Sequence, residues 1–366
     1  MAKTVKRAFK YRFYPTREQG AELGRTFGCV RLVWNKALDE RTRVYATESR
    51  KTTYIQLSAA LTGWKKTDDL AFLNEVSSVP LQQSLRHQQA AFSNFFAKRA
   101  RYPRFKSRKK SKASAEYTRS AFTWRGGQLT LAKMKTPLDI RWSRELPDEP
   151  STVTVSKDSA GRWFVSILTE DTIEPAPATD STVGVDVGLT SLAVLSTGEK
   201  VTNPRYERRD RRKLAKAQRS LSRKARGSNN REKARRKVAR VHARIIDRRT
   251  DFLHKLSTRL IRENQAIAIE DLTVRNMLGN HALARSISDA SWRQLRTMLE
   301  YKADWYGRDL LLVDRWYPST RVCSGCGALH EKLPLNVREW ECRCGVTHDR
   351  DVNAARNILA AGLAER

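Results

Sequence analysis

The chain has 366 residues, 40% of them hydrophobic, so it can bury a large core and divide into two or more domains. Lys and Arg number 71 against 39 Asp and Glu, and the net charge of +32 favours nucleic acid as a partner and argues against a basic one. Because no run of about 18 apolar residues occurs and the N-terminus lacks an apolar segment, we expect no membrane span, no secretory signal and a cytoplasmic protein.

The N-terminal part is predicted to be a small β-barrel that carries a helical insertion. Aromatic and basic residues alternate over the first residues, which predicts a half-buried strand ended by Pro15. Thr16 and Gln19 have the spacing of a capping box, and a helical pattern follows them. Further helices are predicted at 54–62 and 80–98, and alternating runs with turn residues predict strands after residue 119. The predicted bounds are 1–15 and 119–173 for the barrel and 16–118 for the insertion.

A basic tract follows the second of these helices. Residues 98–112 contain nine basic residues and no acid, interleaved with Tyr102 and Phe105. Cations beside aromatic rings suit phosphates and stacked bases. The candidate nucleic-acid contacts in this tract are Arg104, Lys106, Arg108, Lys109 and Lys110.

A second domain is predicted after the breaker-rich linker "EPAPAT" at 174–179. Residues 205–249 hold 20 basic and 4 acidic residues, in a pattern of two long helices broken near "GSNN" and polar on nearly all sides. A solvated charged hairpin is the alternative, but free solvation favours mixed signs, so we prefer a grip on phosphates. The candidate contacts here are Arg235, Arg236 and Lys237, and the hairpin is predicted to end at residue 262.

Three acids stand where a fold could bring them together. Asp186 lies within the apolar strand "VGVDVG", Glu270 ends the run "AIAIE", and Asp351 opens an alanine-rich helix. Taken singly, a strand acid can pair with an arginine, and Asp349 or Asp351 can cap the helix. A carboxylate among valines is costly unless it is paired or metal-bound, so together they indicate a Mg²⁺ or Mn²⁺ site for phosphodiester hydrolysis. An acid on a first strand, another on a later strand and a third at a helix start form the layout of an RNase H-like α/β fold.

Four of the five cysteines are crowded into one short segment. Cys323 and Cys326, then Cys342 and Cys344, are separated by fifteen residues and predict a zinc knuckle at 323–345. The second pair has only one residue between its cysteines, so His330 or His348 could replace a thiolate at the Zn²⁺ ion. A metal-free loop is the alternative. Cys29 stands alone in a helical pattern and is interpreted as packing.

Several motifs together resemble the TnpB family, RNA-guided nucleases encoded by bacterial insertion sequences and related to type V CRISPR effectors. The similar segments are "FKYRFYPT", "YPRFKSRKK", "GVDVGLTSLAVLS", "AIEDLTVRNM", "SISDASWRQLRTMLEYKADWYG", "CSGCG", "CRCG" and "THDRDVNAARNILAAG". The resemblance implies a RuvC-like nuclease domain at 180–322 and 346–366, with Asp186, Glu270 and Asp351 as its catalytic triad. It also implies a guide RNA from the transposon end, a double-stranded DNA target with a short adjacent motif, and a bacterial or archaeal host in which the complex acts at the nucleoid.

Recognition of the adjacent DNA motif is predicted for the helical insertion. "TTYIQLS" and "VPLQQSL" resemble family segments that meet the flanking duplex, and a glutamine amide can bond bidentately to an adenine edge. The candidates are Tyr54, Ser58, Ser78, Gln82 and Gln83. Rival hypotheses are a transposase acting directly on transposon ends, a nuclease-dead RNA-guided repressor, and a ribosomal or chaperone-like RNA-binding protein.

Overall fold

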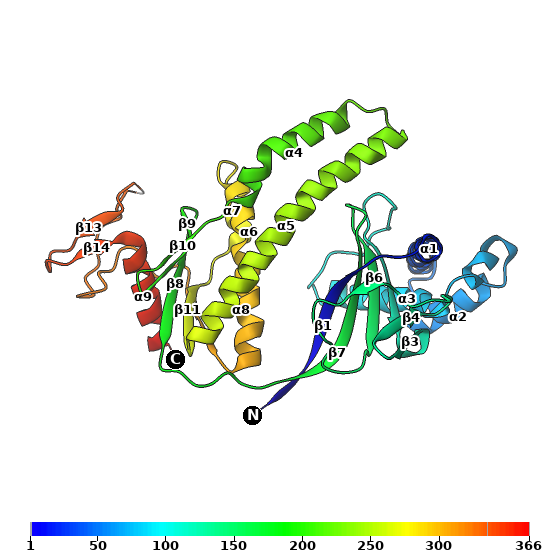
Figure 1. Ribbon diagram of the computed structural model, residues 1–366, viewed down its shortest axis with the longest axis horizontal. Helices are drawn as coiled ribbons and strands as arrows, with labels where there is room; N and C mark the ends of the chain where they lie inside the picture. Colours follow the sequence, from blue (N-terminus) through cyan, green and yellow to red (C-terminus); the bar gives the residue numbers. More distant parts are fainter. Residues whose placement is uncertain (1, 335, 366) are drawn as a thin grey trace. The chain divides into compact units, whose positions relative to one another are not determined.

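The computed structural model describes residues 2–334 and 336–365, and the chain divides into two compact units. One unit comprises Thr4–Thr172, and the other comprises the chain from Ile173 onward together with the residues before Thr4 (Figure 1). Within the described residues, no helix is both long and apolar enough to cross a membrane.

The first unit contains a five-stranded sheet in the order β2-β6-β7-β1-β5 and a separate two-stranded hairpin, β3-β4. Its strands are β1 Lys3–Phe13, β2 Ala113–Thr118, β3 Phe122–Arg125, β4 Gln128–Leu131, β5 Ile140–Arg141, β6 Thr152–Lys157 and β7 Trp163–Ile173. Alternating residues of β1, β6 and β7 face one buried cluster, which includes Tyr11, Val155 and Ile167. Because the sheet and the hairpin are separate ladders within the described residues, a closed barrel remains a prediction.

Helices fill the insertion between β1 and β2. They are α1 Arg17–Glu48, α2 Tyr54–Trp64, η1 Asp68–Asn74 and α3 Ser78–Phe96, and the short helix η2 Arg119–Ala121 lies between β2 and β3. The predicted capping box is present, since the Gln19 N–H donates to Thr16 Oγ1 and the Thr16 N–H donates to Gln19 Oε1. Cys29 is buried among Val33, Leu57 and Leu85, so its role as packing is confirmed.

The second unit is built on a five-stranded mixed sheet in the order β10-β9-β8-β11-β12. β8 pairs antiparallel with β9 and parallel with β11, which pairs parallel with β12. The strands are β8 Thr182–Val187, β9 Ser191–Leu195, β10 Lys200–Thr202, β11 Ala266–Glu270 and β12 Asp309–Val313. The helices are α4 Tyr206–Ser222, α5 Asn229–Glu263, α6 Val274–Met277, α7 Ala284–Ala290, α8 Trp292–Tyr306 and α9 Arg350–Ala364.

The two faces of this sheet are covered by different helices. Figure 1 shows α5 and α8 on one side of β8 and β11 and α9 on the other. Val183, Val185, Ile267 and Ile269 enter the main core with α5 and α8. Residues between them along each strand face α9, because side chains alternate across a sheet. The segment from β12 to α9 carries the four clustered cysteines and a small hairpin, β13 Glu339–Glu341 and β14 Thr347–Asp349.

Candidate active site

Two of the three predicted acids lie on adjacent strands and on the same face. β8 and β11 run in parallel, with Gly184 opposite Ala268 and Val185 opposite Ile269. Asp186 and Glu270 follow at the carboxyl ends of these strands, two residues beyond Gly184 and Ala268. By the two-residue period they share the face that α9 covers.

The third acid is brought to this edge by close packing of α9. A β-carbon at Gly184 would lie 2.0 Å from the Ala355 carbonyl oxygen, so the helix touches the strand backbone there. Asp351 precedes Ala355 by about one helical turn, close to 6 Å along the axis. The distance from Gly184 to Asp186 along β8 is similar, about 6.6 Å. A glycine on the strand therefore permits the approach that places Asp351 near Asp186.

The acids influence one another electrostatically. Burial raises the pKa of Asp186 well above its ordinary value, the negative charges of Glu270 and Asp351 raise it further, and Arg350 opposes them. Burial also raises the pKa of Glu270, although a hydrogen bond lowers it, donated by Ser319 Oγ to Glu270 Oε1 at 2.8 Å. The shift of Asp186 indicates that negative charge is crowded around this side chain without enough neutralising cations, whereas the shift of Glu270 reflects its burial.

Asp349 and Asp351 have different roles, although both open α9. Asp349 is the N-cap, and its Oδ1 accepts from the N–H groups of Asp351 at 3.1 Å and Val352 at 3.0 Å. Its other oxygen pairs with Lys200. Burial raises the pKa of Asp349, but the Lys200 ammonium and the backbone donors outweigh burial and lower it overall. Asp349 is thus structural, and Asp351 is left to face Asp186.

Two contacts of the acidic site were not predicted from the sequence. Ser319 binds Glu270 and lies in "YPSTRVC", directly before the first cysteine pair. Arg338 Nη1 lies 3.4 Å from Asp351 Oδ1 and 3.5 Å from Oδ2. The Arg338 carbonyl accepts from the Arg350 N–H at 2.8 Å, so its backbone is held at the start of α9. No local pattern marks either residue, because each contact joins distant parts of the chain.

The donor chemistry of the acidic site suits a hard divalent cation. Carboxylate oxygens are the ligands that Mg²⁺ and Mn²⁺ prefer, and the crowded negative charge would be relieved by such an ion. Within the described residues, only the cysteine cluster brings three or more potential ligand atoms within 4.8 Å of one another. The looser spacing of the acids is compatible with a pair of ions about 4 Å apart, whose ligands need not all converge on one point.

The four cysteines form a cluster with the spacing of a tetrahedral metal site. The Sγ atoms of Cys323 and Cys344 are 3.7 Å apart, and those of Cys326 and Cys342 are 3.6 Å apart. Zn–S bonds of about 2.3 Å in a tetrahedron place sulfurs about 3.8 Å apart. The cluster could therefore hold Zn²⁺. Although burial raises the pKa of the Cys323 thiol, backbone N–H donors and His348 lower it to about 5, which favours the thiolate.

The two histidines flank the cysteine cluster. His348 Nε2 lies 3.0 Å from Cys323 Sγ, and His330 Nε2 lies 3.2 Å from Cys342 Sγ. Both rings pack on Trp340, with centroids 4.7 and 4.8 Å away. All four thiols are within reach of one ion, and each histidine has a ring nitrogen within hydrogen-bond distance of a sulfur.

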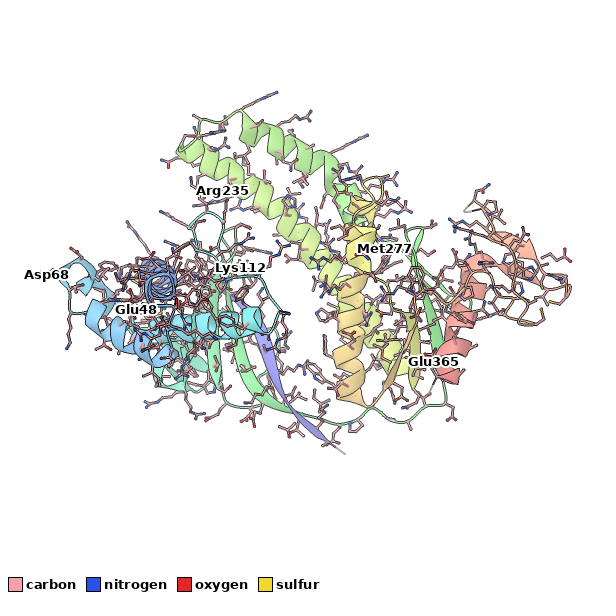
Figure 2. The ribbon with its side chains drawn as sticks, turned by 180° about the vertical axis from the view of Figure 1, so that it is seen from behind. Glu48, Asp68, Lys112, Arg235, Met277 and Glu365 are labelled. Carbon is pink, nitrogen blue, oxygen red and sulfur yellow. The ribbon has the colours of Figure 1, made fainter. Side chains whose placement is uncertain are left out.

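The basic hairpin consists of α4 and α5, with the break between residues 222 and 229. The expectation that it is polar on nearly all sides is wrong, because Leu214, Val241 and Ile245 form a buried seam between the helices. Sequence reasoning missed this seam because the three residues are scattered among many charges. Side chains extend outward along both helices in Figure 2, which labels Arg235. Arg235, Arg236 and Lys237 are exposed, and the first two share Glu232, at 2.8 and 3.6 Å.

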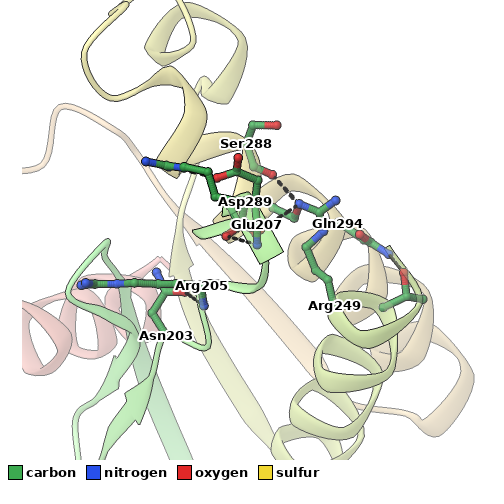
Figure 3. A network of polar contacts seen from close by, with 10 residues as sticks. Asn203, Arg205, Glu207, Arg249, Ser288, Asp289 and Gln294 are labelled. Atoms are coloured by element: carbon green, nitrogen blue, oxygen red, sulfur yellow. Dashed lines mark hydrogen bonds and ion pairs between the residues drawn. The ribbon is translucent and has the colours of Figure 1, made fainter. Parts of the chain in front are cut away.

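A polar network fixes the base of this hairpin (Figure 3). Asp289, the penultimate residue of α7, accepts from the Glu207 N–H in the first turn of α4 at 3.0 Å. Its other oxygen lies 3.4 Å from Arg249 Nη1 of α5, which also donates to the Ser288 carbonyl at 2.9 Å. One carboxylate thus joins both hairpin helices to the segment that follows Glu270.

The basic tract of the first unit is tied to α1. Trp34 Nε1 donates to the Arg104 carbonyl at 3.0 Å, and Asn35 bonds both the carbonyl and the N–H of Lys106 at 2.9 and 2.7 Å. Lys106 Nζ lies 3.6 Å from the centroid of the Trp34 ring, and burial lowers its pKa to about 8. The remaining candidates of the tract are exposed: Arg104, Arg108, Lys109 and Lys110.

The candidates for reading the DNA motif differ in accessibility. Ser78 and Gln82 are exposed, and Tyr54 and Ser58 are half-buried. Gln83 is only 8% exposed, so its amide does not face solvent in this conformation. Sequence reasoning could not separate the two glutamines, because the side of α3 that packs inward is set by its partners.

Comparisons with known families match most of the chain. A family model described as "Probable transposase" matches residues 162–281, which include Asp186 and Glu270. A model described as "Cas12f1-like, TNB domain" matches residues 292–358, which include the four cysteines and Asp351. A model described as "Helix-turn-helix domain" matches residues 1–50. A solved Cas12f1–sgRNA–target DNA complex has the same fold, with a TM-score of 0.58 over 97% of this chain and 98% of that chain at 12% identity.

Two curated relatives match nearly the full chain. A Streptomyces pristinaespiralis protein described as "Putative RNA-guided DNA endonuclease" is 73% identical over 100% of this chain and 91% of its own length. The Escherichia coli K12 protein "Putative RNA-guided DNA endonuclease InsQ" is 36% identical over 98% of this chain and 92% of its own length. With the matching family models, these relatives show that the chain belongs to the TnpB family.

Proposed function

We propose that this chain is an RNA-guided double-stranded DNA endonuclease. It would take its guide RNA from the transposon end, require a short motif beside the target, and hydrolyse phosphodiesters with Mg²⁺ or Mn²⁺ in an RNase H-like (RuvC) domain. The observation that carries the proposal is the placement of Asp186, Glu270 and Asp351 at one edge of a sheet. The descriptions of the two full-length relatives support the same activity.

The three carboxylates would hold the catalytic cations. When bound, such ions activate the attacking water and stabilise the leaving oxygen. The chain's own residues orient the carboxylates: the Ser319 hydroxyl fixes Glu270, and the Asp349 cap fixes the first turn of α9 and with it Asp351. Arg338 lies beside Asp351, where its positive charge would partly neutralise this carboxylate when no metal ion is bound.

The zinc knuckle at 323–345 would set the register of α9. One Zn²⁺ bound by Cys323, Cys326, Cys342 and Cys344 closes a loop that has little core of its own. The knuckle is also joined to α9 through Asn353, whose side chain donates to the Val322 carbonyl and accepts from the Ser324 N–H. Loss of the metal would therefore loosen the start of α9, and cutting would fall indirectly.

The basic elements would hold nucleic acid by phosphate contact. The tract at 98–112 and the hairpin at 205–262 offer many cations and few amides, which suits guide RNA or the guide–target duplex. Motif reading would fall to Tyr54, Ser58, Ser78 and Gln82, with Gln83 contributing only if α3 repacks.

The proposed domains are a barrel at 1–15 and 119–173, its helical insertion at 16–118, and a nuclease domain at 180–322 and 346–366. On target, the complex would act at the nucleoid.

The test is cleavage of a plasmid target by protein purified with its guide RNA. Asp186→Ala, Glu270→Ala and Asp351→Ala should each abolish cutting and leave RNA binding intact, because each removes a metal ligand and leaves the basic surface unchanged. Full cutting by any one variant would contradict the triad. Strand transfer without a guide would instead favour a transposase, and target binding without cutting by the wild type would favour a repressor.

A further inference from the structure

A cavity of about 380 Å³ opens at the carboxyl end of β11, directly beside the acidic site. Glu270 lines it, and so do residues of the segment that follows and of α8. The volume lies within the usual range for small-ligand sites, about 300–1,000 Å³. Because Glu270 belongs to both the cavity and the triad, a group bound in the cavity would lie next to the reacting phosphate.

The charges of the cavity leave two arginines available. Arg296 forms ion pairs with Asp271 and Glu300, and Arg315 lies 4.0 Å from Asp271, so two cations and two carboxylates neutralise one another in the wall. Arg275 and Arg293 also line the cavity, and both side chains are exposed. Neither forms an ion pair or a side-chain hydrogen bond with the residues that the structure describes. Free guanidinium groups at the mouth of a cavity suit a phosphate, which they can bind through paired N–H donors.

Part of the cavity wall is apolar. Leu272 and Trp292 line it, and Trp292 is only 6% exposed. A nucleobase matches these walls, because its faces stack on apolar and aromatic groups.

We propose that this cavity binds one unpaired nucleotide of the DNA strand about to be cut. Its base would enter between Leu272 and Trp292, and its phosphate would meet Arg275 and Arg293. The nucleotide must be unpaired, because a base inside a duplex is stacked and does not present its faces to a protein cavity. This inference rests on the proposed endonuclease function and adds a binding site for the substrate strand to it.

The first test measures single-turnover cutting by the guide-loaded protein. Arg275→Gln and Arg293→Gln should each slow cutting about tenfold and leave guide RNA and target binding unchanged, because each removes one charge-assisted contact. Arg285→Gln is the matched control, since Arg285 is an exposed arginine on α7 outside the cavity. Equal rates for all three variants and the wild type would overturn the proposal.

The second test separates the cavity from general charge. Target strands carry one abasic position at successive sites around the cut, and one position should slow the wild type about tenfold. Thr297→Trp places a bulky side chain at the cavity from an exposed site on α8, and it should slow cutting and remove this dependence on the base. Leu278→Trp lies in a neighbouring apolar cavity only and should retain the dependence.

The outcomes distinguish the inference from the function on which it rests. If the wild type cuts but no single abasic position matters, or Thr297→Trp keeps the dependence, the subsite is wrong and the nuclease assignment stands. If the wild type does not cut any guided target, the proposed function fails, and the subsite fails with it.

Discussion

Gly184 is the residue at which packing is most directly linked to the proposed catalytic triad. An alanine there would place its methyl carbon 2.0 Å from the Ala355 carbonyl oxygen and 2.9 Å from the Leu359 N and Cβ atoms. Real β-carbons essentially never approach closer than 3.0 Å, so α9 must move away from β8 by about 1 Å. Overpacking of this kind costs about 1–3 kcal/mol of unfolding free energy.

The same displacement should be more damaging to activity than to stability. Asp351 lies one turn from the contact, so it would move relative to Asp186 and Glu270. A misplacement of about 1 Å can lower a rate by about 100-fold. We therefore expect Gly184→Ala to cut guided DNA about 100-fold more slowly while its melting temperature falls by only about 3–10 °C.

The assay is single-turnover cutting together with a thermal melt of the same preparation. Gly362→Ala is the matched control, because its added carbon would lie 2.9 Å from Ala268 Cβ and 3.1 Å from Leu311 Cβ, again beneath α9. It is about 16 Å along the helix from Asp351, so it should cost stability and leave cutting nearly normal. A wild-type rate for Gly184→Ala, or equal rate losses for both variants, would refute the reasoning.

Three further predictions concern charge and metal. Asp186→Asn should abolish cutting yet raise the unfolding free energy of the metal-free protein by about 1–3 kcal/mol near neutral pH. The fold raises the pKa of Asp186, so the free energy of unfolding of the wild type should fall as the pH rises from the pKa of this carboxyl in the unfolded chain to its higher pKa in the folded protein. Thermal melts of the variant should not show this fall. Elemental analysis should find one Zn²⁺ per chain, and Cys326→Ser should lower the melting temperature of the second unit; full activity in zinc-free protein would argue against the knuckle. Replacing Arg235, Arg236 and Lys237 by Gln should weaken complex formation and flatten its salt dependence, and a changed motif in a randomised flanking library would contradict phosphate binding.

Local spacing in the sequence was sufficient to propose a ligand type for each candidate site. Four cysteines in two close pairs, an acid inside an apolar strand and a basic tract with aromatic residues each identify a ligand type, because donor atoms and charges are properties of single side chains. The capping box at Thr16 and the break in the basic hairpin were also predictable, since both depend on neighbours within a few residues.

The tertiary structure decided which of several equivalent residues does which task. Asp349 and Asp351 look alike in sequence, but only Asp349 forms hydrogen bonds with Lys200 and with the first N–H groups of α9. Gln82 and Gln83 differ only in the side of α3 on which they fall, and Gly184 has no local signal of its importance. In each case the deciding contact comes from a residue distant in the sequence. Such contacts depend on how helices and strands pack, and the spacing of residues along the chain does not determine that packing.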